Sequence, residues 1–172
     1  MKIAVIGDGG WGTALAILLN NKKYNVTLWS VSAGYAEYLD KKRYNPKFLP
    51  GVKIPKGIVI TNDLEKAVSG ADIILLAVPS QYMRSVLKRI KKLNYPASAI
   101  YLSAAKGIEI GSLNRMSEVM HEELGNIKLA VLSGPTIALE VACRIPTTAV
   151  VASRDKVTGK YLQGIFMTQV FR

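Results

Sequence analysis

The N-terminal stretch of the chain constrains the fold more than any other part. Residues 2–6 are apolar and β-branched, which predicts a buried strand, and residues 11–19 have the apolar pattern of a helix. Between them, Gly7, Gly9 and Gly12 follow the spacing G-x-G-x-x-G. Strand, glycine turn and helix in this order predict a dinucleotide-binding Rossmann unit. A glycine-rich turn in another α/β fold is the alternative.

Each of these glycines has a mechanical role in such a unit. Gly7 permits the tight turn, Gly9 lets a pyrophosphate approach the backbone, and Gly12 lets the helix pack closely on the strand. The helix N-terminus then offers free N–H groups and a partial positive charge to the phosphates.

Length and composition favour one cytoplasmic domain. The chain has 172 residues, of which 49% are hydrophobic, so it can bury a substantial core. Its single cysteine, Cys143, excludes an intramolecular disulfide and suits a reducing compartment. No apolar run approaches the ~20 residues of a membrane span, and the N-terminal stretch lacks the cleavage site of a signal peptide. We therefore expect no membrane insertion.

The net charge of +11 favours an anionic partner. The basic residues are nevertheless scattered in short clusters near the ends of predicted helices, at 22–23, 41–43, 88–89 and 91–92. Cations are stabilising at helix C-termini. We therefore expect solvated helix ends and attraction of phosphorylated small molecules, with no nucleic acid as partner.

Strand and helix patterns alternate along the chain. Strands are expected at 2–6, 25–29, 58–61, 72–78, 99–103, 128–132 and 147–152, with a possible final strand from 169 to 171. Helices are expected at 11–19, 34–43, about 63–69, 81–92, 112–124, 136–143 and 154–166, whereas 45–51 is expected to be a loop. Asn62 or Asp63, Ser80 and Ser112 are the expected helix caps. The alternation predicts an α/β fold, a Rossmann-type doubly wound, mostly parallel sheet with helices on both faces.

The carboxyl ends of the strands form the expected ligand edge. In a Rossmann unit, the residue that reads the ribose lies about 20 residues past the glycines. Trp29, Ser30, Val31 and Ser32 occupy that position, without the carboxylate typical of NAD sites or the arginine typical of NADP sites. Ser30 or Ser32 could hydrogen-bond a 2′-hydroxyl or a 2′-phosphate, so the choice between NAD and NADP stays open.

Lys106 is the most informative single residue outside the glycine turn. It follows the strand expected at 99–103, in a loop of small residues at the ligand edge. An ammonium there could polarise a carbonyl or hold an anionic substrate. A surface lysine without function is the alternative, since most lysines are exposed.

The remaining candidates have simpler interpretations. His121 is expected to be a solvated helix residue, Cys143 a packed thiol and Glu109 a surface residue. Asp72 is expected at the start of a strand, and no metal site is predicted. Trp11 is expected to pack against the cofactor or to belong to the core, and the two interpretations are compatible.

Five motifs occur in an order that resembles a known family. They are GDGGWGTALA, NPKFLPG, AVPSQ, SAAKGIE and SGPTIALEVA. Together they resemble the N-terminal half of the bacterial-type NAD(P)-dependent glycerol-3-phosphate dehydrogenases, over essentially all of residues 2–172. The resemblance implies reversible hydride transfer between NAD(P)H and dihydroxyacetone phosphate, which feeds glycerophospholipid synthesis. It also implies a homodimer for the full-length protein.

The resemblance assigns roles to individual residues. Gly10, Trp11 and Ala138 would contact the cofactor, as would Lys106, which would also touch the substrate. Gly134 and Thr136 would help to hold the substrate. The family's helical C-terminal domain, which carries the lysine thought to act as general acid/base, is absent from the chain. The implied domain is therefore a dinucleotide-binding domain, residues 1–172, cut from a longer protein and inactive alone.

Two departures from the family pattern bear on the cofactor. Val31 and Ser32 stand where the family often carries His or Arg, which argues against a strong NADP preference. Asp8 replaces the commoner alanine, and its carboxylate must point away from the pyrophosphate or repel it.

Two alternatives to this enzyme remain. One is an NAD(P)-binding module without catalysis. The other is a related two-domain dehydrogenase of hydroxy acids or ketopantoate, against which the SGPT and NPKFLPG stretches argue.

Overall fold

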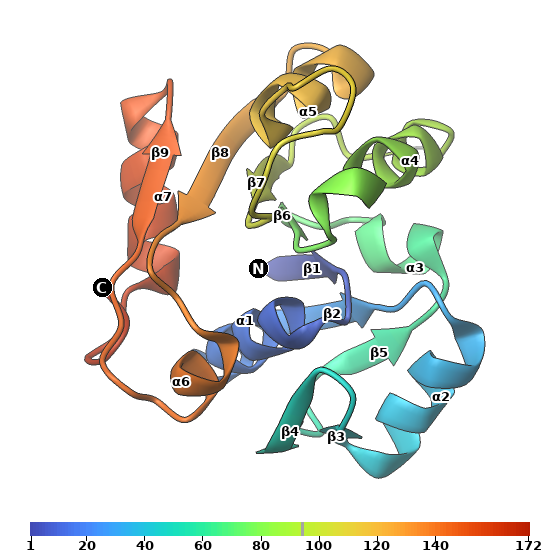
Figure 1. Ribbon diagram of the computed structural model, residues 1–172, viewed down its shortest axis with the longest axis vertical. Helices are drawn as coiled ribbons and strands as arrows, with labels where there is room; N and C mark the ends of the chain where they lie inside the picture. The colour runs from blue at the N-terminus through green and yellow to red at the C-terminus, as the bar shows by residue number, and fades with distance from the viewer. Residues whose placement is uncertain (94) are drawn as a thin grey trace.

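A seven-stranded sheet organises the computed structural model, which describes residues 1–93 and 95–172 (Figure 1). Its strands are β1 (Lys2–Ile6), β2 (Asn25–Trp29), β5 (Val59–Thr61), β6 (Ile73–Leu76), β7 (Ile100–Ser103), β8 (Lys128–Ser133) and β9 (Val150–Ser153). The strand order is β5-β2-β1-β6-β7-β8-β9, and the neighbours are parallel except for β8 and β9. The predicted doubly wound, mostly parallel sheet is confirmed.

Seven helices are assigned among the described residues. They are α1 (Gly10–Asn21), α2 (Ala33–Lys42), α3 (Leu64–Val68), α4 (Ser80–Lys91), α5 (Met116–Leu124), α6 (Ala138–Ala142) and α7 (Lys156–Phe166). One apolar cluster lies between the sheet and α1, α6 and α7, and a second lies between the sheet and α3, α4 and α5. Helices therefore cover both faces, as predicted.

The strand order reverses between β1 and β6. From β1 the chain adds β2 and β5 on one side, and from β6 it adds β7 and β8 on the other. In open parallel sheets, ligands bind beyond the carboxyl ends of the strands at such a switch point. The glycine turn after β1 lies at this position.

The segment 45–51 was expected to be a loop, and this expectation is wrong in part. Tyr44–Asn45 (β3) and Leu49–Lys53 (β4) pair as a small antiparallel hairpin outside the main sheet. Pro50 lies within β4. Proline is tolerated there because each strand of a two-stranded hairpin has a free edge, where no ladder hydrogen bond is lost.

Two predicted helix caps are wrong. Pro79, with ψ of 142°, is the residue before α4, so Ser80 already belongs to the first turn. The helix expected from Ser112 begins only at Met116, because Leu113 has a left-handed φ of 58°. The Ser112 hydroxyl instead donates to Glu109 Oε2 at 2.6 Å. The Asp63 cap is confirmed, since its carboxylate accepts from the Lys66 N–H at 3.0 Å.

The C-terminal part is less regular than expected. Of the helix expected at 136–143, only the five residues of α6 are helical. The strand expected at 147–152 is β9, shifted by a few residues. Residues 169–171 contribute a single parallel bridge, between Thr147 and Phe171, and no strand. With five residues, α6 rises only about 7.5 Å, too little to carry the chain back along β8. The chain therefore enters β9 from the same edge and runs antiparallel.

An ion-pair network braces the loop that carries Lys106. Arg84 on α4 donates to Glu109 at 2.7 Å, and also to Glu122 at 2.6 Å and Glu123 at 2.7 Å on α5. Glu109 was expected to be a surface residue, but its side chain is only 15% exposed. Hydrogen bonds from Arg84, and then from Ser112, lower the pKa of Glu109 to about 2.

The close packing of α1 on β1 predicts a large effect of Gly12→Ala. A Cβ at Gly12 would lie 1.9 Å from the Gly7 carbonyl oxygen, so α1 would have to shift. We expect the free energy of unfolding in urea to fall by at least about 2 kcal/mol. Gly164→Ala, an exposed position of α7 with no neighbour within 4 Å, is the control. It should leave stability unchanged or raise it by about 0.5 kcal/mol. Equal effects of both substitutions would contradict this account.

The Arg84 network predicts a pH dependence of stability. Because folding lowers the Glu109 pKa from 4.5 to about 2, its contribution is fully present above pH 4.5 and is lost as the pH falls toward 2. Glu109→Gln should lower the melting temperature near neutral pH, and the difference from wild type should narrow on acidification. Glu65→Gln removes an exposed carboxylate in α3. Its melting temperature, plotted against pH, should run parallel to that of wild type. A Glu109→Gln difference that is constant with pH would exclude this role.

Candidate functional site

The glycine turn is built from backbone that side chains would block. Gly7 has a φ of +120°, and a Cβ there would lie 2.8 Å from the Ala77 carbonyl oxygen of the neighbouring segment. A Cβ at Gly10 would lie 2.3 Å from the Phe48 carbonyl oxygen. At Gly9, by contrast, no atom lies within 4 Å of the Cβ position. The turn is thus packed on its inner side and open at Gly9.

The open position coincides with the N-terminus of α1. Gly9 is the N-cap residue, and no side chain caps the free N–H groups of the first turn. Free N–H groups and the helix dipole favour an anion at this point. A dinucleotide pyrophosphate therefore fits the space that a Cβ at Gly9 would fill.

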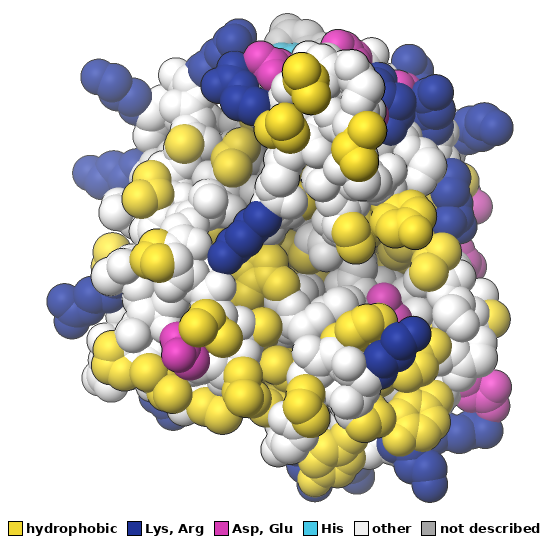
Figure 2. All heavy atoms as spheres, in the orientation of Figure 1, with side chains coloured by type: hydrophobic (Ala, Val, Ile, Leu, Met, Phe, Trp, Pro, Cys, Tyr) yellow, Lys and Arg dark blue, Asp and Glu magenta, His cyan; other side chains and the backbone are white. Residues whose placement is uncertain are grey.

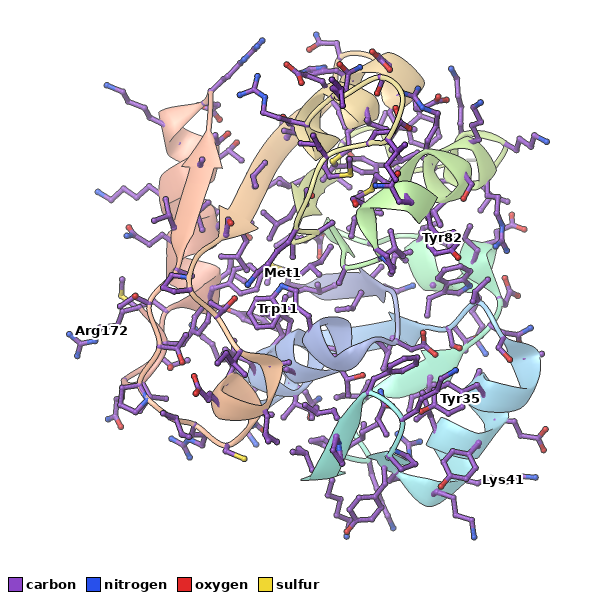
Figure 3. All side chains as sticks on the ribbon, in the orientation of Figure 1. Met1, Trp11, Tyr35, Lys41, Tyr82 and Arg172 are labelled. Atoms are coloured by element: carbon purple, nitrogen blue, oxygen red, sulfur yellow. The ribbon has the colours of Figure 1, made fainter. Side chains whose placement is uncertain are left out.

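Two loops lie beside the glycine turn, one after β7 and one before α6. Trp11 Nε1 donates to the Ala104 carbonyl oxygen at 3.1 Å, which ties α1 to the loop after β7. Lys106 Nζ donates to the Thr136 carbonyl oxygen at 3.0 Å, which ties the same loop to the turn before α6. Figure 3 shows Trp11 beside β1, at the centre of the fold. The partly buried Trp11 also packs against the core, as one of its two interpretations predicted.

The turn between β8 and α6 completes this side of the site. The Thr136 N–H donates to the Gly134 carbonyl oxygen at 2.8 Å, and Thr136 is buried. A Cβ at Gly134 would lie 2.9 Å from the Thr148 carbonyl oxygen, so this backbone also runs close to its neighbour. Ala138 lies next to Gly10, with its Cβ 3.6 Å from the Cβ position of the glycine. The residues predicted from three of the five motifs, GDGGWGTALA, SAAKGIE and SGPTIALEVA, are thus brought to one edge of the sheet.

The end of β2 differs from a simple ribose-reading position. Ser30 is fully buried, and its hydroxyl donates to Asp8 Oδ2 at 2.6 Å. Ser32 is exposed, and its hydroxyl accepts from the Tyr35 N–H at 3.3 Å as the cap of α2. The exposed group at this point is therefore Ser32, whereas Ser30 lies beneath Asp8.

Asn45 is a site residue that the sequence reasoning missed. It is fully buried in the hairpin, and its Nδ2 donates at 2.8 Å to both the Asp8 carbonyl oxygen and Thr13 Oγ1. Its Oδ1 accepts from Tyr35 Oη at 2.6 Å and from the Phe48 N–H at 3.2 Å. Tyr35 reaches it from α2 (Figure 3). The NPKFLPG motif contains Asn45, but its pattern indicated only a loop.

The other candidate residues lie apart from this edge. Cys143 was expected to be a packed thiol, and this is wrong, because it is exposed just after α6. His121 is exposed on α5, as predicted, and contacts the Gly125 carbonyl oxygen at 3.0 Å. Asp72 accepts from the Lys2 backbone N–H at 2.7 Å at the opposite edge of the sheet. Within residues 1–93 and 95–172, no group of His, Cys, Asp and Glu is arranged to hold a metal ion.

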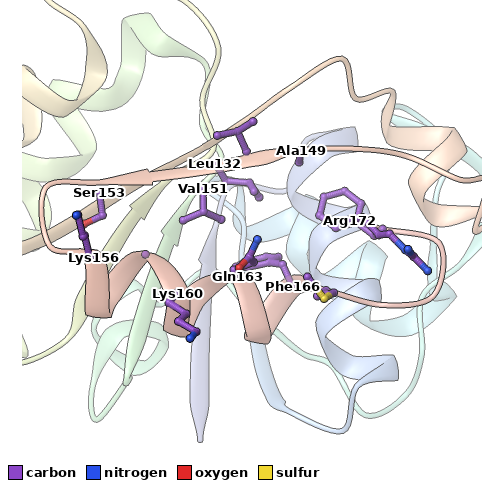
Figure 4. Close-up of a pocket in the computed structure, with 13 residues that line it drawn as sticks. Leu132, Ala149, Val151, Ser153, Lys156, Lys160, Gln163, Phe166 and Arg172 are labelled. Atoms are coloured by element: carbon purple, nitrogen blue, oxygen red, sulfur yellow. The ribbon is translucent and has the colours of Figure 1, made fainter.

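A cavity of about 520 Å³ lies away from the glycine turn (Figure 4). It is bounded by β9, by α7 and by the last residues of the chain, with Val151 and Phe166 on its apolar side and Lys156, Lys160 and Arg172 around it. None of its lining residues belongs to the glycine turn or to the Lys106 loop. The phosphate-binding geometry lies at the turn, so we do not assign the dinucleotide to this cavity.

The surface around the turn is hollowed, with apolar side chains along one side (Figure 2). The exposed apolar residues of the hairpin and of the α6 region are Tyr44, Phe48, Ile137 and Leu139. Lysines and arginines lie mainly around the periphery of this face. In the part of the chain that the structure describes, no helix has the length and apolarity needed to cross a membrane.

Comparisons with known proteins agree with this geometry. The family model described as "NAD-dependent glycerol-3-phosphate dehydrogenase N-terminus" matches residues 2–158. A glycerol-3-phosphate dehydrogenase (NAD(P)+) of Fusobacterium nucleatum is 45% identical over 174 residues, which cover 100% of this chain and 52% of that protein. One from Streptomyces coelicolor is 40% identical over 174 residues, with coverage of 100% and 52%.

Solved structures show the same relationship. The crystal structure of glycerol-3-phosphate dehydrogenase from Coxiella burnetii superimposes with a TM-score of 0.93 at 35% identity, covering 99% of this chain and 52% of that chain. The enzyme from Saccharomyces cerevisiae gives a TM-score of 0.84 at 29% identity, covering 100% and 55%. The chain spans about half the length of the curated relatives it matches. It therefore belongs to the NAD-dependent glycerol-3-phosphate dehydrogenase family and corresponds to the N-terminal part of that family's proteins.

Proposed function

We propose that residues 1–172 are the dinucleotide-binding domain of an NAD(P)-dependent sn-glycerol-3-phosphate dehydrogenase. The proposed reaction is reversible hydride transfer between NAD(P)H and dihydroxyacetone phosphate, which feeds glycerophospholipid synthesis. The observation that carries the proposal is the glycine turn at the switch point of the sheet, open at Gly9 and flanked by Lys106. Family membership supports the identity of the substrate.

The cofactor side of the proposal rests on backbone geometry. Gly7, Gly10 and Gly12 keep the turn compact, and Gly9 leaves room for the pyrophosphate at the start of α1. Trp11 braces the loop after β7 against α1. Ala138 flanks the same turn through its packing on Gly10. Ser32 is exposed at the end of β2, where the ribose is proposed to lie, and the buried Ser30 contacts that position through Asp8. When bound, the nicotinamide supplies the hydride chemistry.

Lys106 is the main residue proposed to contact the substrate. Its ammonium, held at 3.0 Å by the Thr136 carbonyl oxygen, is placed to stabilise negative charge on a carbonyl oxygen or a phosphate. Gly134 and Thr136 form the turn on which that ammonium rests. A protein of these residues alone is proposed to bind the dinucleotide without turnover, because relatives of the family are about twice as long.

For the full-length protein, we expect a cytoplasmic homodimer that acts on small molecules and not on nucleic acid. Membership of a dehydrogenase family supports this expectation, as does the placement of lysines and arginines mainly around the periphery of the face that carries the site.

Titration of the chain with NADH and with NADPH tests the cofactor site. Gly9→Val should weaken binding of either dinucleotide at least about tenfold, since the new side chain fills the pyrophosphate position. Its melting temperature should change little, because no atom lies near that Cβ position. Energy transfer from tryptophan to the reduced nicotinamide gives the readout. Saturable wild-type binding that Gly9→Val leaves intact would place the site elsewhere.

Lys106→Met tests the role of the ammonium. Loss of one charged contact should weaken NADH binding by roughly tenfold in the same titration. Lys160→Met, an exposed lysine on α7 beside the distant cavity, is the matched control and should bind like wild type. Equal affinities of the Lys106→Met variant and wild type would remove Lys106 from the cofactor site.

A further inference from the structure

Asp8, the residue between the first two glycines of the turn, has its carboxylate fixed beside the end of β2. Its Oδ2 accepts a hydrogen bond from Ser30 Oγ at 2.6 Å. Its backbone carbonyl oxygen accepts from Asn45 Nδ2 at 2.8 Å and from Thr13 Oγ1 at 3.2 Å. Asp8 is half-buried whereas Ser30 is fully buried, so Asp8 is the member of this pair that reaches the surface.

Within the part of the chain that the structure describes, the Asp8 carboxylate forms no ion pair with a lysine, arginine or histidine. Lys47, in the neighbouring hairpin, lies 4.9 Å above the centroid of the Phe48 ring. Burial raises the pKa of Tyr35, and the negative charge of Asp8 raises it further. The Asp8 carboxylate therefore lies close enough to the Tyr35 hydroxyl of α2 to interact with it electrostatically.

A carboxylate at this place has a defined effect on a dinucleotide. In Rossmann units, an acidic residue at the end of the second strand accepts hydrogen bonds from the ribose hydroxyls of NAD, whereas NADP requires a cation for its 2′-phosphate. The end of β2 here carries no acidic residue of its own. The glycine turn supplies one from the adjacent strand instead, through the contact of Asp8 with Ser30.

We propose that Asp8 is the specificity-determining residue that makes this site prefer NAD(H) over NADP(H). Ser30 is a positioning residue that acts through Asp8 by directing its carboxylate toward the ribose. The anchored carboxylate accepts from a ribose hydroxyl and repels a 2′-phosphate. This inference rests on the proposed function, because it requires that the glycine turn binds a dinucleotide.

The test compares the dissociation constants of NADH and NADPH for wild type and Asp8→Asn. Wild type should bind NADH at least about tenfold more tightly than NADPH. Asp8→Asn keeps an acceptor for Ser30 but removes the charge, so the preference should fall at least about fivefold, chiefly through tighter binding of NADPH. Asp8→Ala is the second neutral variant if Asp8→Asn proves unstable. General damage to the fold would weaken the binding of both cofactors alike and leave the ratio of their dissociation constants unchanged.

Asp72→Asn is the matched control, since it removes one negative charge at the opposite edge of the sheet. It should leave the ratio of the two constants unchanged. An unchanged ratio in both neutral Asp8 variants, or tighter binding of NADPH than of NADH by wild type, overturns the role of Asp8 while the proposed function stands. Failure of wild type to bind either dinucleotide overturns the proposed function, and this inference with it.

Discussion

The contact between the start of α1 and the end of β1 supports the rest of the site. Gly12 lies so close to the Gly7 carbonyl oxygen that a single methyl group would separate helix from strand. This approach lets the buried face of α1 pack on the sheet and points the N-terminus of the helix at the switch point. A helix displaced by even an ångström would misplace both its free N–H groups and Trp11, which anchors the loop of Lys106.

The hairpin and the glycine turn form one polar unit around Asn45. A buried amide is costly unless its donors and acceptor are paired. Here they are paired with the turn, with α1, with Tyr35 and with Phe48. The same unit holds the backbone of Asp8, so the orientation of its carboxylate depends on a segment far away in the sequence. On the proposed role of Asp8, the choice of cofactor would depend on the docking of the hairpin.

On the β6 side of the switch point, ion pairs hold the loop after β7 in place. Arg84 joins α4, the loop after β7 and α5 through three carboxylates. The loop that carries Lys106 is thus held at two points. Ion pairing with Arg84 holds Glu109, and the Thr136 carbonyl oxygen holds the Lys106 side chain. Lys106 is exposed, but its ammonium is held by this hydrogen bond, unlike that of a free surface lysine.

The sequence by itself determined the alternation of strands and helices, the glycine turn and the ligand edge, because apolar periodicity and glycine spacing are local properties of the chain. It also predicted site roles for Lys106, Gly134 and Thr136, through motifs and the family they resemble. Only the tertiary structure decided the direction of β9, the start of α5 and the burial of Ser30. It also decided the hydrogen bonds of Asn45 and Asp8, because their partners are 32 and 22 residues away in the sequence. Contacts across such separations arise from packing, which no local pattern encodes.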